Sequence, residues 1–292
     1  MVVQSNSLIE AHYKQEYTVQ EQRTVLWLIS KIHRQDLSLI ESGTFKKVII
    51  SAVEYAHLMN ISVENVYRDA QKIADALGSK RFTIKTDTGW LNVGWIATME
   101  YKKGEAILEA EISPKLIPYL IDLKEKFTSF RLENILLLQS SHAIKLYQIL
   151  TQYKKIGERL IEIEEMKSML GVTSLPSYAR YNNIKQKILE ISKREINSKT
   201  DITISYEEIK KGRKVAALKF KITTKRNQET QAIEAFEKYI SALPEGTTVK
   251  TLFKQYGLNQ STVEEAFKNF TKNIVKYEPN SSRPLQFIEG TN

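Results

Sequence analysis

Cysteine is absent from the 292-residue chain, which excludes disulfide bonds and thiolate metal sites and fits a reducing compartment. Glycine and proline are scarce, at 11 and 6 residues, and 42% of the chain is hydrophobic, so the composition indicates a globular protein. No apolar run approaches the roughly 20 residues of a membrane-spanning helix. The first residues also lack the basic and then apolar segments of a secretory signal. We therefore expect a cytoplasmic protein that does not bind membranes.

Motifs of the common enzyme classes are missing as well. The sequence has no phosphate-binding G-x-x-x-x-G-K-[ST] loop, no H-E-x-x-H metal motif and no G-x-S-x-G nucleophile motif. A nicking enzyme would hold its metal with a His-x-His pair beside a tyrosine nucleophile. The four histidines are instead scattered, at His12, His33, His57 and His142. We predict that the protein is not an enzyme and uses no cofactor and no metal.

Acidic residues are outnumbered in one part of the chain only. The net charge is +9, and residues 126–226 hold 21 Lys and Arg against 10 Asp and Glu, whereas the two flanking segments are each close to neutral. A positive field concentrated in this way attracts polyanions, most often nucleic acid. A basic surface that served only solubility would not need to be confined to one third of the chain.

The predicted elements repeat along the sequence. The first set comprises a helix at 18–33, a strand at 45–51, helices at 51–59 and 62–77, strands at 81–87, 90–101 and 105–113, and a helix at 114–127. The second set comprises a helix at 140–156, a strand at 158–163, helices at 164–170 and 178–197, and strands at 201–209 and 215–223. Predicted helix signals are a Thr18/Glu21 capping box, caps at Ser51, Ser62 and Ser177, and stops at Gly78 and Gly171.

Each set contains a helix, a strand, a helix-turn-helix and a hairpin, which is the order of a winged-helix module. One occurrence would be a weak signal, because helical hairpins are common. From two in tandem we predict the α+β class, with two tandem winged-helix domains and a small helical C-terminal tail. The predicted boundaries are 1–127 for the first domain, 128–226 for the second, and 227–292 for a helical extension with a flexible end.

The predicted helix at 178–197 has an apolar face and a basic, polar face. Tyr181, Ile184, Ile188 and Ile191 follow at spacings of three and four, so they should pack on the domain core. Arg can donate two hydrogen bonds to guanine, Asn can pair with adenine in the same way, and Lys pairs with phosphate. The candidate DNA-binding residues here are Ser177, Tyr178, Arg180, Tyr181, Asn182, Asn183, Lys185, Lys187 and Arg194, with Arg180, Lys187 and Arg194 as a stripe at seven-residue spacing. A solvated amphipathic helix would show a similar pattern.

The hairpin loop at 210–214 favours the DNA-binding interpretation. Lys210, Lys211, Arg213 and Lys214 surround one glycine there, at the tip where a wing would contact the DNA backbone. A charged turn that only discourages aggregation would not explain why the neighbouring helix is basic too.

The first module carries a weaker signal. Its second helix is nearly neutral, so we expect modest backbone contact at most, from Arg68, Lys72, Lys80 and Arg81. The alternating strand at 105–113 would suit pairing across a dimer interface. We therefore expect this module to combine dimerisation with auxiliary DNA contact.

Three stretches resemble a known family, the plasmid replication initiator (Rep) proteins with tandem winged helices that act at iteron-containing origins of theta-replicating plasmids. They are NSLIEAHYKQEYTVQEQRTVLWLISKI at 6–32, SSHAIKLYQILTQYKKIGERLIEIEEMKSMLGV at 140–172, and the stretch at 178–220, where REINSKTDI leads to KKGRKV. The similarity spans about 6–224 and leaves out the tail.

The resemblance implies a protein that binds tandem origin repeats (iterons) as a monomer and helps to melt adjacent AT-rich DNA. It implies partnership with host initiation proteins and helicase in a bacterial cytoplasm, and repression of its own gene when dimers bind an inverted repeat. It also implies that the second module is the main base reader, with its recognition helix at 178–197 and its wing at 210–214.

Other functions remain open at this point. A purely regulatory winged-helix repressor would bind a single inverted repeat instead of several direct repeats. A nicking enzyme would need divalent metal and would leave a covalent tyrosine adduct. A protein-docking scaffold would bind DNA weakly and without sequence preference.

Overall fold

The computed structural model describes residues 1–32, 47–121, 123 and 126–225, all within one unit that spans Met1–Lys225. The predicted tail at 227–292 lies outside the described residues. So do the last residue of the predicted helix at 18–33, the first two residues of the strand at 45–51 and part of the helix at 114–127.

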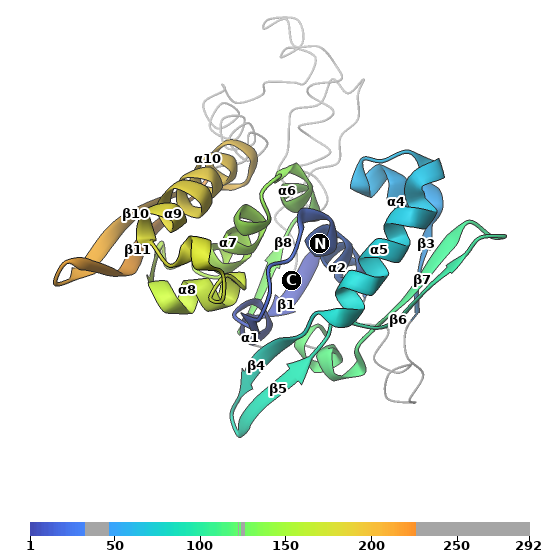
Figure 1. Cartoon of the computed structure of the whole chain (residues 1–292), viewed down its shortest axis with the longest axis horizontal. Helices are drawn as coiled ribbons and strands as arrows, with labels where there is room; N and C mark the ends of the chain where they lie inside the picture. Colours follow the sequence, from blue (N-terminus) through green and yellow to red (C-terminus); the bar gives the residue numbers. More distant parts are fainter. Residues whose placement is uncertain (33–46, 122, 124–125, 226–292) are drawn as a thin grey trace, which may run out of the picture. The chain divides into compact units, whose positions relative to one another are not determined.

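Among the described residues, the first half of this unit is built from a short N-terminal segment followed by three α-helices and five strands (Figure 1). The segment contains β1 (Val2–Ser5), α1 (Asn6–Ile9) and β2 (His12–Tyr13). The helices are α2 (Val19–Ser30), α4 (Ala52–Met59) and α5 (Val66–Ser79), with β3 (Lys47–Ser51) between α2 and α4. The strands after α5 are β4 (Phe82–Thr86), β5 (Gly89–Val93), β6 (Ile96–Lys102) and β7 (Ile107–Ile112).

The second half follows a 3-10 turn at Pro114–Tyr119. Its elements are β8 (Phe127–Phe130), α6 (Leu132–Leu137), α7 (Ser141–Thr151), β9 (Glu158–Glu162), α8 (Ile163–Leu170), α9 (Tyr181–Ile184), a π-helical segment (Lys185–Leu189), α10 (Glu190–Lys199), β10 (Ile202–Lys211) and β11 (Lys214–Thr224). β8 pairs with β1 at the start of the chain, so the N-terminus is tied to the second half.

The two halves contain the same three-stranded antiparallel sheet. The strand order is β3-β7-β6 in the first half and β9-β11-β10 in the second, and in each sheet the strand before the helix pair lies beside the last strand of the hairpin. This is the winged-helix topology, so the prediction of two tandem winged-helix domains in an α+β chain is confirmed. The wings are therefore β6–β7 and β10–β11. The hairpin β4–β5, which pairs with β2, is an additional element of the first module.

Two strand predictions for the first module were wrong. The predicted strand at 90–101 is divided at Gly94 and Trp95 into β5 and β6, which belong to different sheets. β7, expected to pair across a dimer interface, is the central strand and is hydrogen-bonded to β3 on one side and β6 on the other. Its alternating pattern arises because one face of this inner strand packs on the helices and the other faces outward.

The predicted helix ends agree with the structure in part. The Thr18/Glu21 capping box and the Ser51 cap are both present. Ser62, however, does not cap a helix through its side chain, because a 3-10 turn at Val63–Asn65 comes before α5. Gly78 lies inside α5, which continues to Ser79.

The start of the predicted recognition helix and the helix expected at Pro114 also differ from prediction. Ser177 lies in a 3-10 turn, and α9 begins three residues later than expected, after Arg180 in extended conformation. The helix predicted from Pro114 is a single 3-10 segment that ends at Tyr119, where Pro118 removes a backbone donor.

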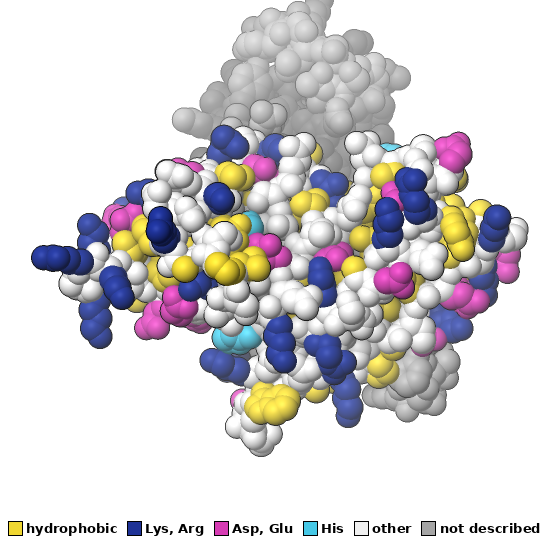
Figure 2. Space-filling view, in the orientation of Figure 1, with side chains coloured by type: hydrophobic (Ala, Val, Ile, Leu, Met, Phe, Trp, Pro, Cys, Tyr) yellow, Lys and Arg dark blue, Asp and Glu magenta, His cyan; other side chains and the backbone are white. Residues whose placement is uncertain are grey.

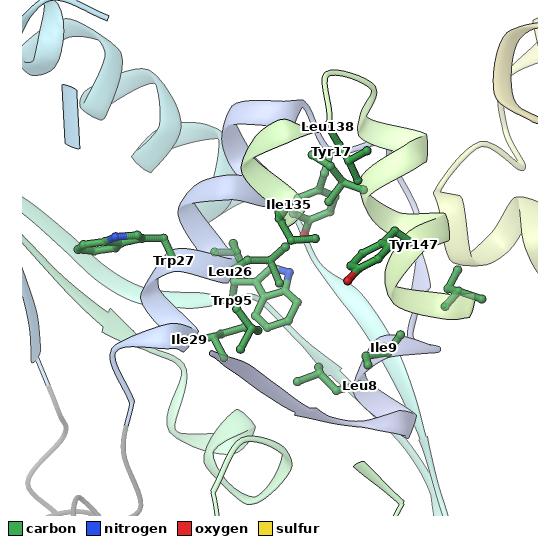
Figure 3. Packing of buried hydrophobic residues seen from close by; sticks show 14 of the residues in the cluster. Leu8, Ile9, Tyr17, Leu26, Trp27, Ile29, Trp95, Ile135, Leu138 and Tyr147 are labelled. Atoms are coloured by element: carbon green, nitrogen blue, oxygen red, sulfur yellow. The ribbon is translucent and has the colours of Figure 1, made fainter. Parts of the chain in front are cut away.

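α7 is buried on every side. Its residues Ala143 to Thr151 are all buried, because the helix packs on α2 of the first module and on α8 and α10 of the second. Figure 3 shows Tyr147 of α7 in the same apolar cluster as Leu8, Ile9 and Trp95 from the first module. One continuous core thus supports both modules.

Polar contacts from the N-terminal segment join the modules around this core. Glu16 Oε1 lies 2.8 Å from His142 Nε2, and His12 Nδ1 lies 2.6 Å from Ser168 Oγ. At Gly171, which has a φ of +73°, an added Cβ would lie 2.3 Å from the carbonyl oxygen of Gln15. The end of α8 therefore approaches the N-terminal segment more closely than a side chain would allow.

Candidate nucleic-acid interface

The predicted recognition helix is continuous in space but not uniform. α9 leads into the π-helical segment Lys185–Leu189, and α10 continues to Lys199. A π turn contains more residues than an α turn, so it rotates the residues after it relative to those before it. Such segments are often found at functional sites.

The π segment moves the buried face of this helix. Ile184 and Ile188 are buried as predicted, but Ile191 is only half-buried, and Leu189, Ser192 and Ile196 carry the core contact instead. The spacing of four between Ile184, Ile188, Ser192 and Ile196 is wider than that of an α-helix. The predicted stripe of Arg180, Lys187 and Arg194 assumed an uninterrupted α-helix, whereas Arg180 precedes the helix and the π segment interrupts the seven-residue repeat.

Several candidate residues before and along this helix are open to solvent. Ser177, Arg180, Asn182, Lys187 and Arg194 are exposed. Among the described residues, Arg180 has no hydrogen-bond or salt-bridge partner, so its guanidinium keeps all five donors. Tyr178 and Asn183 are half-buried.

Asn183 and Tyr178 support the local turn. The Nδ2 atom of Asn183 donates to the carbonyl oxygen of Ser177 at 2.6 Å. The ring of Tyr178 contacts His142 edge-on, with centroids 5.9 Å apart. These two residues therefore hold the turn against α7, and the donor groups that remain open are mainly those of Arg180 and Asn182.

Glu208 of β10 connects the recognition helix to the wing. Its Oε1 atom accepts hydrogen bonds from Tyr181 Oη at 3.0 Å and from Lys185 Nζ at 2.8 Å. The hydrogen bond from Lys185 lowers the pKa of Glu208, and the same bond raises the pKa of Lys185. Burial and the bond to Glu208 raise the pKa of Tyr181. Tyr181 and Lys185 are thus positioned by β10 and are less open to DNA than the sequence suggested.

The wing of the second module presents a cationic tip. β10 and β11 are joined at Gly212 and Arg213, and Gly212 has a φ of +63°, which favours glycine. The tip residues Lys210, Lys211, Arg213 and Lys214 are all exposed. Within the described part of the chain, no Asp or Glu side chain is hydrogen-bonded to any of these four cations. The tip can therefore place several positive charges against phosphates.

The four candidate cations of the first module differ in their surroundings. Lys72 is exposed on α5, and Arg68 is exposed but donates to Asn65 at 2.9 Å. Lys80 is turned inward, with a side chain 14% exposed that donates to Glu21 at 2.6 Å and to the carbonyl oxygen of Glu16. Arg81 is exposed on the extra hairpin. The structure therefore leaves Arg68, Lys72 and Arg81 at the surface and not Lys80.

Lys103 is an exposed cation of the first module that was not among the predicted DNA-binding residues. The wing β6–β7 turns at Lys103 and Gly104, and Lys103 is exposed, while Lys102 pairs with Glu109 at 2.7 Å. The signal was the repeated Lys-Lys-Gly of the two wings, at 102–104 and 210–212. The order of the elements does not identify this wing, because the hairpin that directly follows α5 is β4–β5 and not β6–β7.

Cationic side chains are distributed over one visible face of the molecule. Figure 2 shows Lys and Arg side chains over the β10–β11 hairpin and also over the α4–α5 and β4–β5 regions of the first module.

Within the described ranges, no helix is long and apolar enough to cross a bilayer. No group of three or more potential metal ligands is found in that same part of the chain.

Two models of protein families match the chain. A family model described as "Initiator Replication protein, WH1" matches residues 1–151, and one described as "Initiator Rep protein, WH2" matches residues 162–222. The chain belongs to this family of replication initiator proteins. The first match covers the first module and extends through α7, and the second runs from the end of β9 into β11.

Two curated relatives are both from Escherichia coli. An uncharacterized 27.6 kDa protein is 23% identical over 219 residues, which cover 70% of this chain and 88% of the relative. The PI protein is 25% identical over 213 residues, which cover 61% of this chain and 70% of the relative. Among solved structures, the Pi initiator protein in complex with iteron DNA matches with a TM-score of 0.59 and 21% identity, over 77% of this chain and 98% of that one. This likeness supports the tandem winged-helix fold.

Proposed function

We propose that this initiator binds the direct repeats of its own replication origin as duplex DNA, with the second module as the main sequence reader. The observation that carries the proposal is the surface made by the start of the recognition helix and the wing. There Arg180 and Asn182 are open to solvent, and Glu208 links the same helix to the hairpin whose tip carries four exposed cations. The similarity to a protein solved with iteron DNA supports the choice of direct repeats as the target.

The chemistry of the two parts of this surface suggests different roles. Arg180 can donate two parallel hydrogen bonds to guanine, and Asn182 can pair in the same way with adenine. Lys187, Arg194 and the cations of the wing tip suit phosphates, which fix the register but carry no base information. Tyr181, Lys185 and Glu208 hold helix and wing in one geometry, so the base readers meet the groove at a defined angle.

The first module, with predicted bounds 1–127, is proposed to add backbone contact and to take part in dimerisation. Its contacts come from Arg68, Lys72, Arg81 and Lys103. The second module, with predicted bounds 128–226, holds the excess of positive charge. A role in contacts with host proteins is open to the tail at 227–292.

Origin opening, host recruitment and autoregulation complete the proposal. Binding of several copies to tandem repeats would supply the free energy that melts adjacent AT-rich DNA, without catalysis by the protein itself. The bound copies would then recruit host initiation proteins and helicase in the bacterial cytoplasm. As a dimer the protein would bind an inverted repeat and repress its own gene.

The test of origin opening uses a supercoiled plasmid that carries the DNA upstream of the gene. Permanganate oxidises unpaired thymines, so the purified full-length protein should create reactive thymines in an AT-rich tract beside the repeats. The Arg180→Ala variant at the same concentration serves as the control and should create fewer. A protein that occupies a single inverted repeat and leaves every thymine unreactive, with host initiation proteins added, would be a repressor and not an initiator.

A further inference from the structure

The extra hairpin β4–β5 has an outer face unlike the rest of the first module. Phe82, Ile84 and Val93 of this hairpin are buried, so the residues between them point to the opposite face. That outer face carries Thr83 and Lys85 on the first strand, with Arg81 directly before it, and Trp90 and Asn92 on the second. Among the described residues 126–225, the second winged-helix module has no such hairpin, so the winged-helix fold itself does not require it.

Trp90 is the exposed tryptophan of the chain. Its side chain is 73% exposed, whereas Trp27 and Trp95 are 4% and 5% exposed. An indole has a large apolar surface, and leaving it in water next to a hairpin turn gives the folded monomer no packing energy. The exposed ring therefore suits contact with a ligand better than a structural role.

Cations and hydrogen-bonding groups surround this ring. Lys85 is the cross-strand partner of Trp90 and is exposed, with no salt bridge in the described part of the chain. Arg81 is fixed by Asn92, because its Nε donates to Asn92 Oδ1 at 2.6 Å and one terminal nitrogen donates to the Asn92 carbonyl oxygen at 2.7 Å. Asp87, in the turn, is the acid of the hairpin.

Figure 2 shows the same arrangement at the end of the molecule where Figure 1 labels β4 and β5. A hydrophobic side chain projects there, and several Lys and Arg side chains flank it. A protein-binding hot spot is usually a cluster of apolar residues that excludes water together. Here the neighbours of the ring on the sheet face are Thr83, Asn92 and cations, so charge complementarity favours a polyanion.

We propose that the outer face of β4–β5 is a separate DNA-binding surface for duplex DNA. Arg81 and Lys85 hold phosphates, and the indole of Trp90 packs on the sugar and base edges of the minor groove, as apolar side chains of other minor-groove binders do. This inference rests on the proposed function and deepens it, because it joins Arg81 with Lys85 and Trp90 in one defined surface of the first module. It would increase affinity largely independently of the sequence that the second module reads.

The test uses the tryptophan fluorescence of the full-length protein. The added duplex has 30 base pairs from the origin of its own replicon and carries a dye, so that anisotropy measures binding independently. Acrylamide reaches exposed indoles, and the Trp90→Phe variant gives the quenching of Trp27 and Trp95, which are buried. We expect the duplex to lower the quenching of the wild type toward that of Trp90→Phe. Duplex binding that leaves acrylamide quenching unchanged would overturn the inference.

Affinity gives a second readout. Trp90→Ala should weaken duplex binding by about fivefold or more, near the lower end of what one aromatic contact to a base contributes. Val53→Ala is the matched control, because Val53 is 66% exposed on α4 and away from the hairpin strands. Trp90→Ala should unfold at the same temperature as the wild type, since the ring is exposed. Equal affinities of Trp90→Ala and Val53→Ala would contradict the inference.

The outcomes separate this inference from the proposed function. If the origin duplex binds no better than a duplex of unrelated sequence, the proposed function fails. The origin duplex could also bind specifically without protecting Trp90 from acrylamide, while one strand of that duplex protects it when added alone. In that case the proposal of a duplex-binding surface on β4–β5 is wrong, and the proposed function stands. Shielding by both the origin duplex and the unrelated duplex is the expected result.

Discussion

Arg159 of β9 and Glu10, which follows α1, form an ion pair that joins the second module to the N-terminal segment. The terminal nitrogen Nη2 of Arg159 lies 2.7 Å from Glu10 Oε1, and Nη1 donates to the carbonyl oxygen of Ile149 at 2.9 Å. The guanidinium also lies 4.5 Å from the centroid of the Tyr153 ring. Arg159 is 5% exposed and Glu10 is 35% exposed, so the two partners do not depend on each other equally.

Because Arg159 is more buried than Glu10, substitution of Arg159 should lower the free energy of unfolding more than substitution of Glu10. Arg159→Met leaves the buried carbonyl oxygen of Ile149 without its donor and should lower the free energy of unfolding by about 2–3 kcal/mol. Glu10→Gln keeps a hydrogen-bond acceptor in a partly solvated place and should cost at most about 1 kcal/mol. Urea unfolding of both variants measures the difference. Equal costs would show that the pair acts as a surface salt bridge.

Lys145 predicts a pH dependence of stability. Its Nζ donates to the Ile9 carbonyl oxygen at 2.7 Å and lies 4.3 Å from the Tyr13 ring centroid. Burial lowers its pKa from 10.5 to about 7, against the opposing charge of Glu10. Between those two values the unfolded chain binds more protons, so stability should rise with pH, by at most about 1.4 kcal/mol per unit.

The Lys145→Met variant removes this contribution and should show a flatter dependence between pH 7 and pH 10 in urea unfolding. Lys14→Met, at an exposed position, is the control and should follow the wild type. Parallel curves for wild type and Lys145→Met would mean that Lys145 reaches solvent in the folded state.

Two glycine substitutions should change stability in opposite directions. Gly171→Ala combines a left-handed residue with a Cβ that would lie 2.3 Å from the backbone of Gln15, so it should cost more than the roughly 1–2 kcal/mol of the left-handed conformation alone. Gly78→Ala lies in α5 with no atom within 4 Å of the added Cβ, and it should stabilise by about 0.5–1 kcal/mol. Thermal unfolding compares them directly. If Gly171→Ala is tolerated as well as Gly78→Ala, the modules do not meet there.

Arg180 tests base reading by the second module. Arg180→Ala should weaken binding to the preferred sequence by about 1–3 kcal/mol and relax the preference at one or two base pairs. Arg131→Ala, which removes another exposed arginine of this half of the chain, is the control. Selection of bound sequences from a randomised duplex library gives both numbers. An unchanged sequence preference would assign Arg180 to solvent or phosphate.

Lys211 tests the wing. Lys211→Ala should weaken all duplexes alike and reduce the slope of log K against log salt by about one unit, as expected for one phosphate contact. Lys221→Ala removes an exposed lysine near the opposite end of the same hairpin and should leave the slope close to that of the wild type. Titrations at four salt concentrations are sufficient. Identical slopes for Lys211→Ala and the wild type would place the tip away from DNA.

Local signals predicted much of the fold. The Thr18/Glu21 capping box and the glycine that ends α8 each depend on residues only a few positions apart. The local sequence is therefore sufficient to predict both. The wing tip at Gly212 was predictable for the same reason. The π segment was not, because the apolar residues around it still fit an α-helical repeat.

The candidate site could be predicted only in part, because some of its side chains are paired with residues far away in the sequence. Lys80 pairs with Glu21, and Lys185 with Glu208, across 59 and 23 positions of sequence. Their charge alone therefore suggested DNA contacts that the fold satisfies internally. The alternating pattern of β7 indicated a strand with two unlike faces, but it did not say whether its edges were free.

The most direct test of the account is a selection of bound DNA by the full-length protein. A fragment library of the replicon that carries the gene is incubated with the protein at physiological salt, and the bound duplexes are sequenced. The account predicts enrichment of tandem direct repeats beside an AT-rich tract, with loss of that enrichment in Arg180→Ala. A single inverted repeat upstream of the gene, or no enrichment at all, would contradict it.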